Sequence, residues 1–218
     1  MVFMVLAFMV LALTPAVLIG PVLAQSPGPS ATTSDLLNAP SREEDTAAVL
    51  ADGGLPTDPL VTAGILLDAL AQAEDGQAAD GLAREIQGLW NRSGSDAVDV
   101  LMLRAGTAMR SNNFTVALDL LDTVIALAPD YAEGWNRRAT VHFMRDDYAS
   151  SIADVQRVLR LQPRHFGALV GIGMILDDLG EDRQAALFLR EALSVHPFLS
   201  NARERLTVID ARLQGTPI

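Results

Sequence analysis

The stretch AEGWNRRATVHFMRDDYASSIADVQRVLRLQP, residues 132–163, decides the fold. Its apolar residues recur three or four positions apart, which is the spacing of one face of an α-helix. The polar run at residues 145–147 divides the stretch into two amphipathic helices joined by a short turn. Pro163 closes the second helix, because proline has no backbone N–H and cannot continue a helix. The stretch therefore predicts a helical hairpin.

This hairpin recurs along the chain with a 34-residue period. Pro129, Pro163 and Pro197 are evenly spaced, and each of them follows an amphipathic stretch. With proline as the thirty-second residue, the units run over 98–131, 132–165 and 166–199. A fixed period of this length is the signature of a solenoid, in which neighbouring units bury a continuous core.

The second unit resembles a tetratricopeptide repeat. Trp135 opens its first helix, Ala139 supplies a small residue, Tyr148 begins the second helix and Pro163 closes it. The other two units match the same pattern at Leu101, Ala105, Phe114, Ala117 and Pro129, and at Leu169, Ile172, Gly173, Gly180, Ala185, Ala192 and Pro197. The resemblance implies an all-α fold: a tetratricopeptide-type α-solenoid of antiparallel helical hairpins.

Both flanks of the three units carry further helical patterns. Residues 60–92 predict another hairpin that lacks the terminal proline, and we interpret 58–97 as a degenerate first repeat or an N-terminal cap. Residues 199–214 carry apolar side chains on one face, so 200–218 should form a capping helix and a tail. A solenoid needs such a cap to cover its last apolar face.

The N-terminal residues 1–24 contain no charged residue and end in Val22-Leu23-Ala24, a pattern typical of a secretory signal peptide cleaved after Ala24. No Lys or Arg precedes the apolar run, and the run is long enough for an uncleaved anchor in the inner membrane. Residues 25–57 are rich in Pro, Ser, Thr and Gly and predict a flexible linker. We expect an exported, periplasmic protein, with membrane anchoring as the alternative.

The composition disfavours several classes of function. A net charge of −11 opposes binding to nucleic acid, whose backbone is also negative. The chain has no Cys, and its three histidines, His142, His165 and His196, occupy unrelated repeat positions without metal-ligand spacing. The pairs Asp146-Asp147 and Asp177-Asp178 fall at predicted turns, where acidic residues are common. We therefore expect no metal site, no cofactor and no enzymatic activity.

Arginine stands at the same first-helix position in two units, at Arg104 and Arg138, where the family usually has leucine. An arginine that faces the second helix pairs with an acid, extends to solvent or contacts a ligand. Asp122 and Asp154, on the second helices, are the candidate partners.

The resemblance also implies a binding surface, because the first helices of this family line a concave groove that holds a peptide or a partner segment. Its groove positions correspond here to Met102, Met109, Arg110, Asn136, Arg137, Thr140, Phe143, Met144, Val170 and Met174. Methionine adapts to apolar partners of varied shape. Some family members grip a C-terminal carboxylate with basic residues and Asn. Asn136 and Arg137 suit that role, but Val170 and Met174 offer no cation in the third unit.

These features together predict a non-catalytic protein–protein interaction scaffold of the bacterial cell envelope. Two alternatives remain open: an accessory factor for envelope assembly or cytochrome maturation, and a self-associating structural protein. The sequence does not identify the partner or the oligomeric state.

Overall fold

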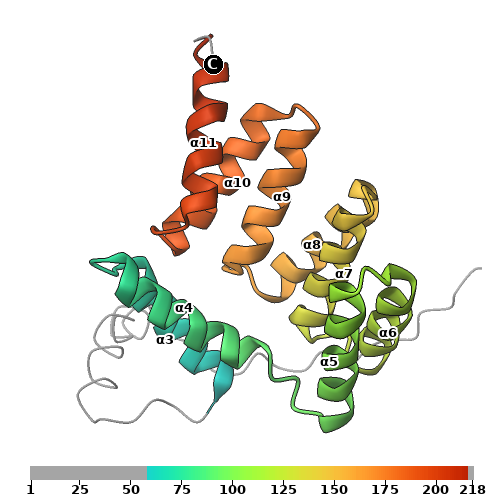
Figure 1. The fold of residues 1–218 in the computed structure, drawn as a ribbon. Coiled ribbons are helices and arrows are strands. Elements are labelled where there is room, and N and C mark those ends of the chain that lie inside the picture. Colours follow the sequence, from blue (N-terminus) through green and yellow to red (C-terminus); the bar gives the residue numbers. More distant parts are fainter. Residues whose placement is uncertain (1–57, 216–218) are drawn as a thin grey trace, which may run out of the picture. The chain divides into compact units, whose positions relative to one another are not determined.

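The computed structural model describes residues 58–215, and all regular secondary structure within that range is α-helical (Figure 1). The helices are α3 (Pro59–Ala71), α4 (Gly76–Trp90), α5 (Asp96–Arg110), α6 (Phe114–Leu127), α7 (Ala132–Met144), α8 (Tyr148–Leu161), α9 (Phe166–Asp178), α10 (Asp182–Val195) and α11 (Ser200–Leu213). The expected signal peptide or anchor (1–24) and linker (25–57) lie outside the described residues. Within 58–215, no helix is both long enough and apolar enough to cross a bilayer.

The three repeat units form the hairpins α5–α6, α7–α8 and α9–α10. Successive hairpins stack because α6 packs against α7 and α8 packs against α9. The predicted all-α solenoid is therefore confirmed.

Each hairpin turns through one residue in the left-handed backbone region. These residues are Asn112 (φ 55°), Asp146 (φ 57°) and Gly180 (φ 77°), and each is separated from the next by one repeat period. Asn, Asp and Gly tolerate positive φ better than other residues. The next residue caps the following helix in two units, where the side chains of Asn113 and Asp147 accept backbone N–H groups of α6 and α8. Asp146 and Asp147 thus have structural roles in the turn.

Small residues set the distance between the two helices of a hairpin. A Cβ on Gly173 in α9 would lie only 2.8 Å from Cγ of Leu189 in α10. In the second hairpin, Ser151 stands where the family pattern expects alanine. Its hydroxyl is buried and donates to the carbonyl of Ala139, 2.8 Å away, so the polar atom is satisfied.

The predicted pairing of Arg138 is confirmed. Its guanidinium makes two hydrogen bonds to Asp154, of 2.8 and 2.7 Å, and a third of 2.7 Å to Asp122. The hydrogen bonds to Asp154 raise the pKa of Arg138 most, against the effect of burial. Arg104, at the same repeat position, is instead exposed and makes no ion pair within 58–215.

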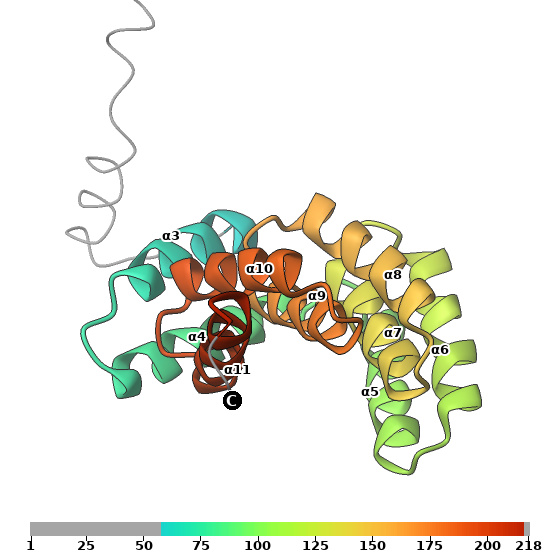
Figure 2. The same cartoon turned by 90° about the horizontal axis from the view of Figure 1, so that it is seen from above.

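The hairpin α3–α4 does not stack on the first repeat as an N-terminal cap would. Instead, α3 packs against α10, and Figure 2 shows these two helices side by side. The α3–α4 residues share one buried apolar cluster with the second and third repeats, whereas α5 and α6 form a separate cluster. Leu70, Ile86 and Trp90 are buried in the shared cluster. Their burial on distant repeats explains why this hairpin leaves α5 uncovered.

At the other end of the stack, α11 packs against α10 and buries Ala202 and Ile209. Arg203, Glu204 and Thr207 are exposed on this helix, together with the apolar Val208 and Leu213. The third repeat is therefore covered by a helix whose outer face is mixed in polarity.

Candidate binding groove

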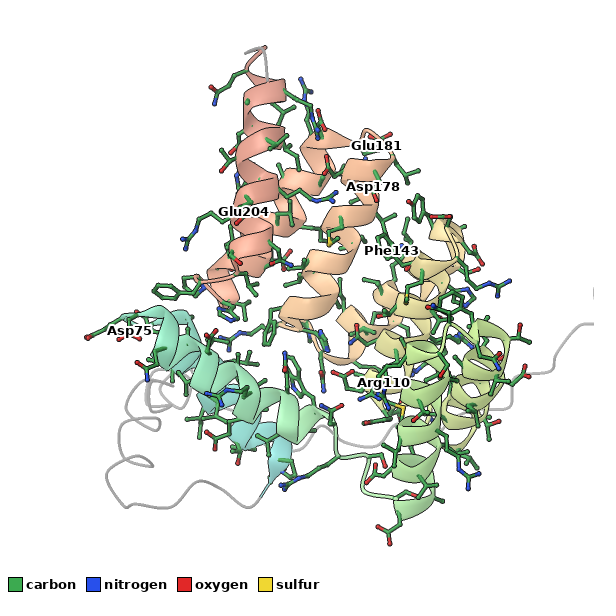
Figure 3. All side chains as sticks on the ribbon, in the orientation of Figure 1. Asp75, Arg110, Phe143, Asp178, Glu181 and Glu204 are labelled. Carbon is green, nitrogen blue, oxygen red and sulfur yellow. The ribbon has the colours of Figure 1, made fainter. Side chains whose placement is uncertain are left out.

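A hollow of about 610 Å³ lies between α9 and α11. Met174 and Val208 are the apolar residues of its lining. The remaining lining residues are Asp177, Asp178, Asn201, Glu204, Arg205 and Arg212. Figure 3 shows Asp178 on α9 and Glu204 on α11.

Residues that line this hollow are spaced by one repeat period. Val208 follows Met174 by one full period, and Arg212 follows Asp178 by the same interval. The helix α11 therefore occupies the place of the first helix of a fourth repeat. The hollow therefore lies where the repeat period, extended by one unit, would continue the predicted groove.

Ion pairs at the hollow connect α11 to the end of α9 and to the start of α10. Arg205 donates to Asp177 at 2.6 Å and to Asp178 at 2.9 Å. Arg212 also donates to Asp177, and it bonds Asp182 at 2.6 Å. Burial opposes the charge of Arg205, but its bonds to the two aspartates raise its pKa overall. Within 58–215, Glu204 makes no ion pair, so its carboxylate is available to a ligand.

The structure leaves most of the expected groove residues accessible. Arg110, Thr140 and Met144 are exposed. A second group is half-buried: Met109, Asn136, Arg137, Phe143 and Met174. The ring of Phe143 stacks on that of Tyr148 with centroids 5.8 Å apart.

Two expected groove residues are buried. Met102 is 4% exposed and belongs to the apolar cluster of the first repeat. Val170 is 7% exposed and belongs to the cluster that also contains α3 and α4. Met102 and Val170 occupy the same repeat position, so the register carried over from the family overestimates the accessibility of that position in the first and third repeats.

Asn136 and Arg137, the residues suited to grip a carboxylate, are engaged by the chain itself. Asn136 donates to Glu133 at 3.1 Å. Arg137 donates to the carbonyl of Met102 at 3.3 Å and to Oδ1 of Asn91 at 2.8 Å, just beyond α4. Asn91, at the C-terminal end of α4, thus binds Arg137, one of the predicted groove residues.

A buried polar cluster joins α4 to the repeats. His165 lies flat against Trp90, with ring centroids 4.4 Å apart and planes inclined by 15°. Its Nδ1 accepts from the backbone N–H of Ala168, so Nε2 carries the proton that faces Oε1 of Glu133, 3.1 Å away. Burial opposes ionisation of Glu133, yet the bonds from His165 and Asn136 and the charge of Arg137 hold its pKa below its usual value.

This cluster has the contacts of a structural junction. The side chain of His165 caps α9 and packs against Trp90 of α4. Both of its ring nitrogens have protein partners. The described part of the chain contains no group of three or more Asp, Glu, His or Cys side chains arranged to hold a metal ion.

Sequence reasoning missed the groove residues of α11, namely Asn201, Glu204, Arg205, Val208 and Arg212. The signal was present in the sequence. Moving one period on from Gly167, Val170, Gly171, Met174 and Asp178 gives these five positions. The last helix is expected from the sequence only to cover the third repeat, but it also extends the groove.

Stacked helical hairpins with a groove on their first helices define a repeat scaffold of the interaction type. Residues 102–159 and 145–198 match the tetratricopeptide repeat family. A TPR repeat-containing protein of Rhizobium etli is 39% identical over 150 residues, which cover 69% of this chain and 74% of that protein. The chain belongs to the tetratricopeptide repeat family.

Solved structures share the fold at low sequence identity. The first TPR domain of Spaghetti (RPAP3), bound to an HSP90 peptide, is 18% identical with a TM-score of 0.52 and covers 54% of this chain and 93% of that one. MamA is 17% identical with a TM-score of 0.51, covering 78% of this chain and 84% of that one. The tetratricopeptide repeat is a fold of protein–protein interaction scaffolds.

Proposed function

We propose that this protein is a non-catalytic scaffold of the bacterial cell envelope that binds a partner segment along its concave groove. The observation that carries the proposal is the hollow between α9 and α11, which continues the groove onto a fourth first-type helix. The peptide bound to the similar Spaghetti domain supports a segment as the ligand.

The lining of the hollow indicates the chemistry of that segment. Met174 and Val208 form an apolar contact surface for one aliphatic or aromatic side chain. Arg205 and Arg212 are already paired with aspartates, whereas Glu204 has no ion pair within the described residues. The segment therefore carries an apolar anchor next to a basic residue. The thioether of Met174 accommodates anchors of different shape.

Peptides selected from a displayed library against the full chain test this proposal. We expect Met174→Glu and Val208→Glu to weaken the selected peptides by about tenfold or more in calorimetric titration, because each places a charge in the anchor site. The matched control is Leu179→Glu, at an exposed leucine in the turn after α9. Equal affinity for all three variants would exclude the groove as the binding site.

We also propose that residues 1–24 direct export, with cleavage after Ala24. N-terminal sequencing of the protein from a cell-envelope fraction tests this proposal. A mature chain that begins at Gln25 is expected, and one that begins at Met1 would contradict cleavage and favour the anchor.

A further inference from the structure

The first repeat presents a helix face that the other repeats bury. The third, seventh and tenth repeat positions fall on the side of α7 that faces α6, where Gly134 lies against Val124 and Arg138 bonds Asp122. Gly134 and Val141 are buried in α7, and Ala168, Ile172 and Ile175 are buried in α9. The equivalent residues of α5, namely Val100, Arg104 and Thr107, are all exposed. No preceding hairpin covers them, because α3–α4 packs on α10.

The exposed face of α5 has an ordered pattern. Asp96, Val100, Leu103, Thr107 and Arg110 follow one another at spacings of four and three residues, which places them in one stripe on a helix. All five are exposed, and Leu103 is 67% exposed. The stripe has two aliphatic residues at its centre, an acid at its N-terminal end and an arginine at its C-terminal end.

This pattern is complementary to itself in the antiparallel direction. Asp96 and Arg110 lie seven residues to either side of Leu103. A two-fold axis at Leu103 would therefore place Asp96 of each copy opposite Arg110 of the other. Within 58–215, neither residue makes an ion pair, although Arg110 donates a hydrogen bond to Thr107. Antiparallel helices also align their dipoles favourably.

We infer that the α5 face is the contact of a symmetric homodimer, in which two α5 helices pair antiparallel about Leu103. Each copy provides the helix that the first repeat of the other copy lacks. The hairpin α3–α4 is not free to take this place, because Leu70, Ile86 and Trp90 are already buried elsewhere. A single helix of about 22 Å makes a small contact, so the dimer dissociates in the micromolar range or weaker.

Sedimentation of the full chain over a range of concentrations measures the dimer. We expect Leu103→Glu to weaken it by about tenfold or more, because two charges would meet at the axis. Leu187→Glu, at a leucine 65% exposed on α10, is the matched control and should dimerise as the unchanged chain does. Circular dichroism checks that each variant is folded.

Charge exchange gives the sharper test. Asp96→Arg and Arg110→Asp should each prevent dimerisation, because each makes like charges face one another at both ends of the contact. A mixture of the two variants should restore a heterodimer, since opposite charges then meet at both ends. A chain that remains monomeric at its highest soluble concentration, or a mixture no heavier than either variant alone, would overturn the inference. Arg110 is also one of the expected groove residues, so the groove is tested at Met174 and Val208, which line the hollow between α9 and α11 and do not belong to the α5 face.

Discussion

Arginine at the seventh repeat position has two different environments in this protein. Arg138 joins two aspartates across two hairpins, and Asp154 is buried at 4% exposure. Arg104 is exposed on α5, because no preceding hairpin packs on this helix and Leu120 stands in α6 where α8 has Asp154. Arginine at the same repeat position thus joins two hairpins in the second repeat and is exposed in the first.

Removing the guanidinium of Arg138 should destabilise the fold, since it leaves the buried carboxylate of Asp154 without its partner. We expect Arg138→Met to lower the free energy of unfolding by about 3 kcal/mol. Arg104→Met is the matched control and should change it by less than about 0.5 kcal/mol. Urea denaturation measures both variants, and an equal loss in the two would contradict the structural role of the ion pairs.

Two glycines of α9 allow the effect of side-chain packing on stability to be distinguished from the effect of helix propensity. A Cβ on Gly173 would lie within 3 Å of Leu189, whereas one on Gly171 would have no atom within 4 Å. We expect Gly173→Ala to destabilise the protein by about 1–3 kcal/mol through overpacking. Gly171→Ala should stabilise it by up to about 1 kcal/mol, because alanine is the better helix former. Thermal unfolding of the two variants should therefore shift in opposite directions.

At the scale of elements, the hairpin α3–α4 is the part whose place differs most from the expectation. Asp68 of α3 pairs with Arg164 at 2.6 Å, and the hydroxyl of Tyr131 donates to the carbonyl of Asn91 at 3.0 Å. Trp90 contacts both His165 and Phe166. These contacts attach the hairpin to the turns that join successive repeats.

Replacing Trp90 should weaken the packing of the hairpin α3–α4 on the repeats but not the packing of α5 on α6. We expect Trp90→Ala to cost about 3–5 kcal/mol and to speed amide hydrogen exchange in α3, α4 and the start of α9. Exchange in α5 and α6 should change little, because their apolar cluster is separate. Leu60→Ala, at an exposed leucine of α3, is the control. Uniform acceleration over all helices would show that the two clusters unfold as one.

For the whole molecule, the buried histidine between α10 and α11 links stability to pH. Burial lowers the pKa of His196, and the nearby charge of Asp80 opposes this only in part. Its Nδ1 is buried without a hydrogen-bond partner in the described range. The unfolded chain binds a proton at residue 196 more readily than the folded chain does, so acid favours unfolding.

The contribution of His196 to stability is complete above its unfolded pKa of about 6.5 and is lost as the pH falls through its lower folded pKa. We expect the free energy of unfolding in urea to decrease as the pH falls below about 6.5. The decrease should be smaller for His196→Phe, which cannot take up the proton. If the free energy of unfolding of that variant depends on pH as it does in the unchanged chain, other groups cause the acid sensitivity.

The sequence by itself determined the three hairpins, since their evidence is local and repeated. The prolines, the small residues and the turn residues act within about one unit of the chain, and the repeat period reproduces them in each unit. The same period placed most of the groove residues on accessible first-type helices. It also contained the positions of Val208 and Arg212, one period beyond Met174 and Asp178.

Only the tertiary structure decided where the hairpin α3–α4 packs and that Arg137 of the predicted groove is held by Asn91, the residue after α4. That choice joins residues far apart in the chain, such as Asp68 with Arg164 and Trp90 with His165. It depends on which apolar faces fit together and remove the most surface from water, a property of folded surfaces that no local pattern contains. The open face of α5 follows from the same choice, because a hairpin that covers the third repeat cannot also cover the first.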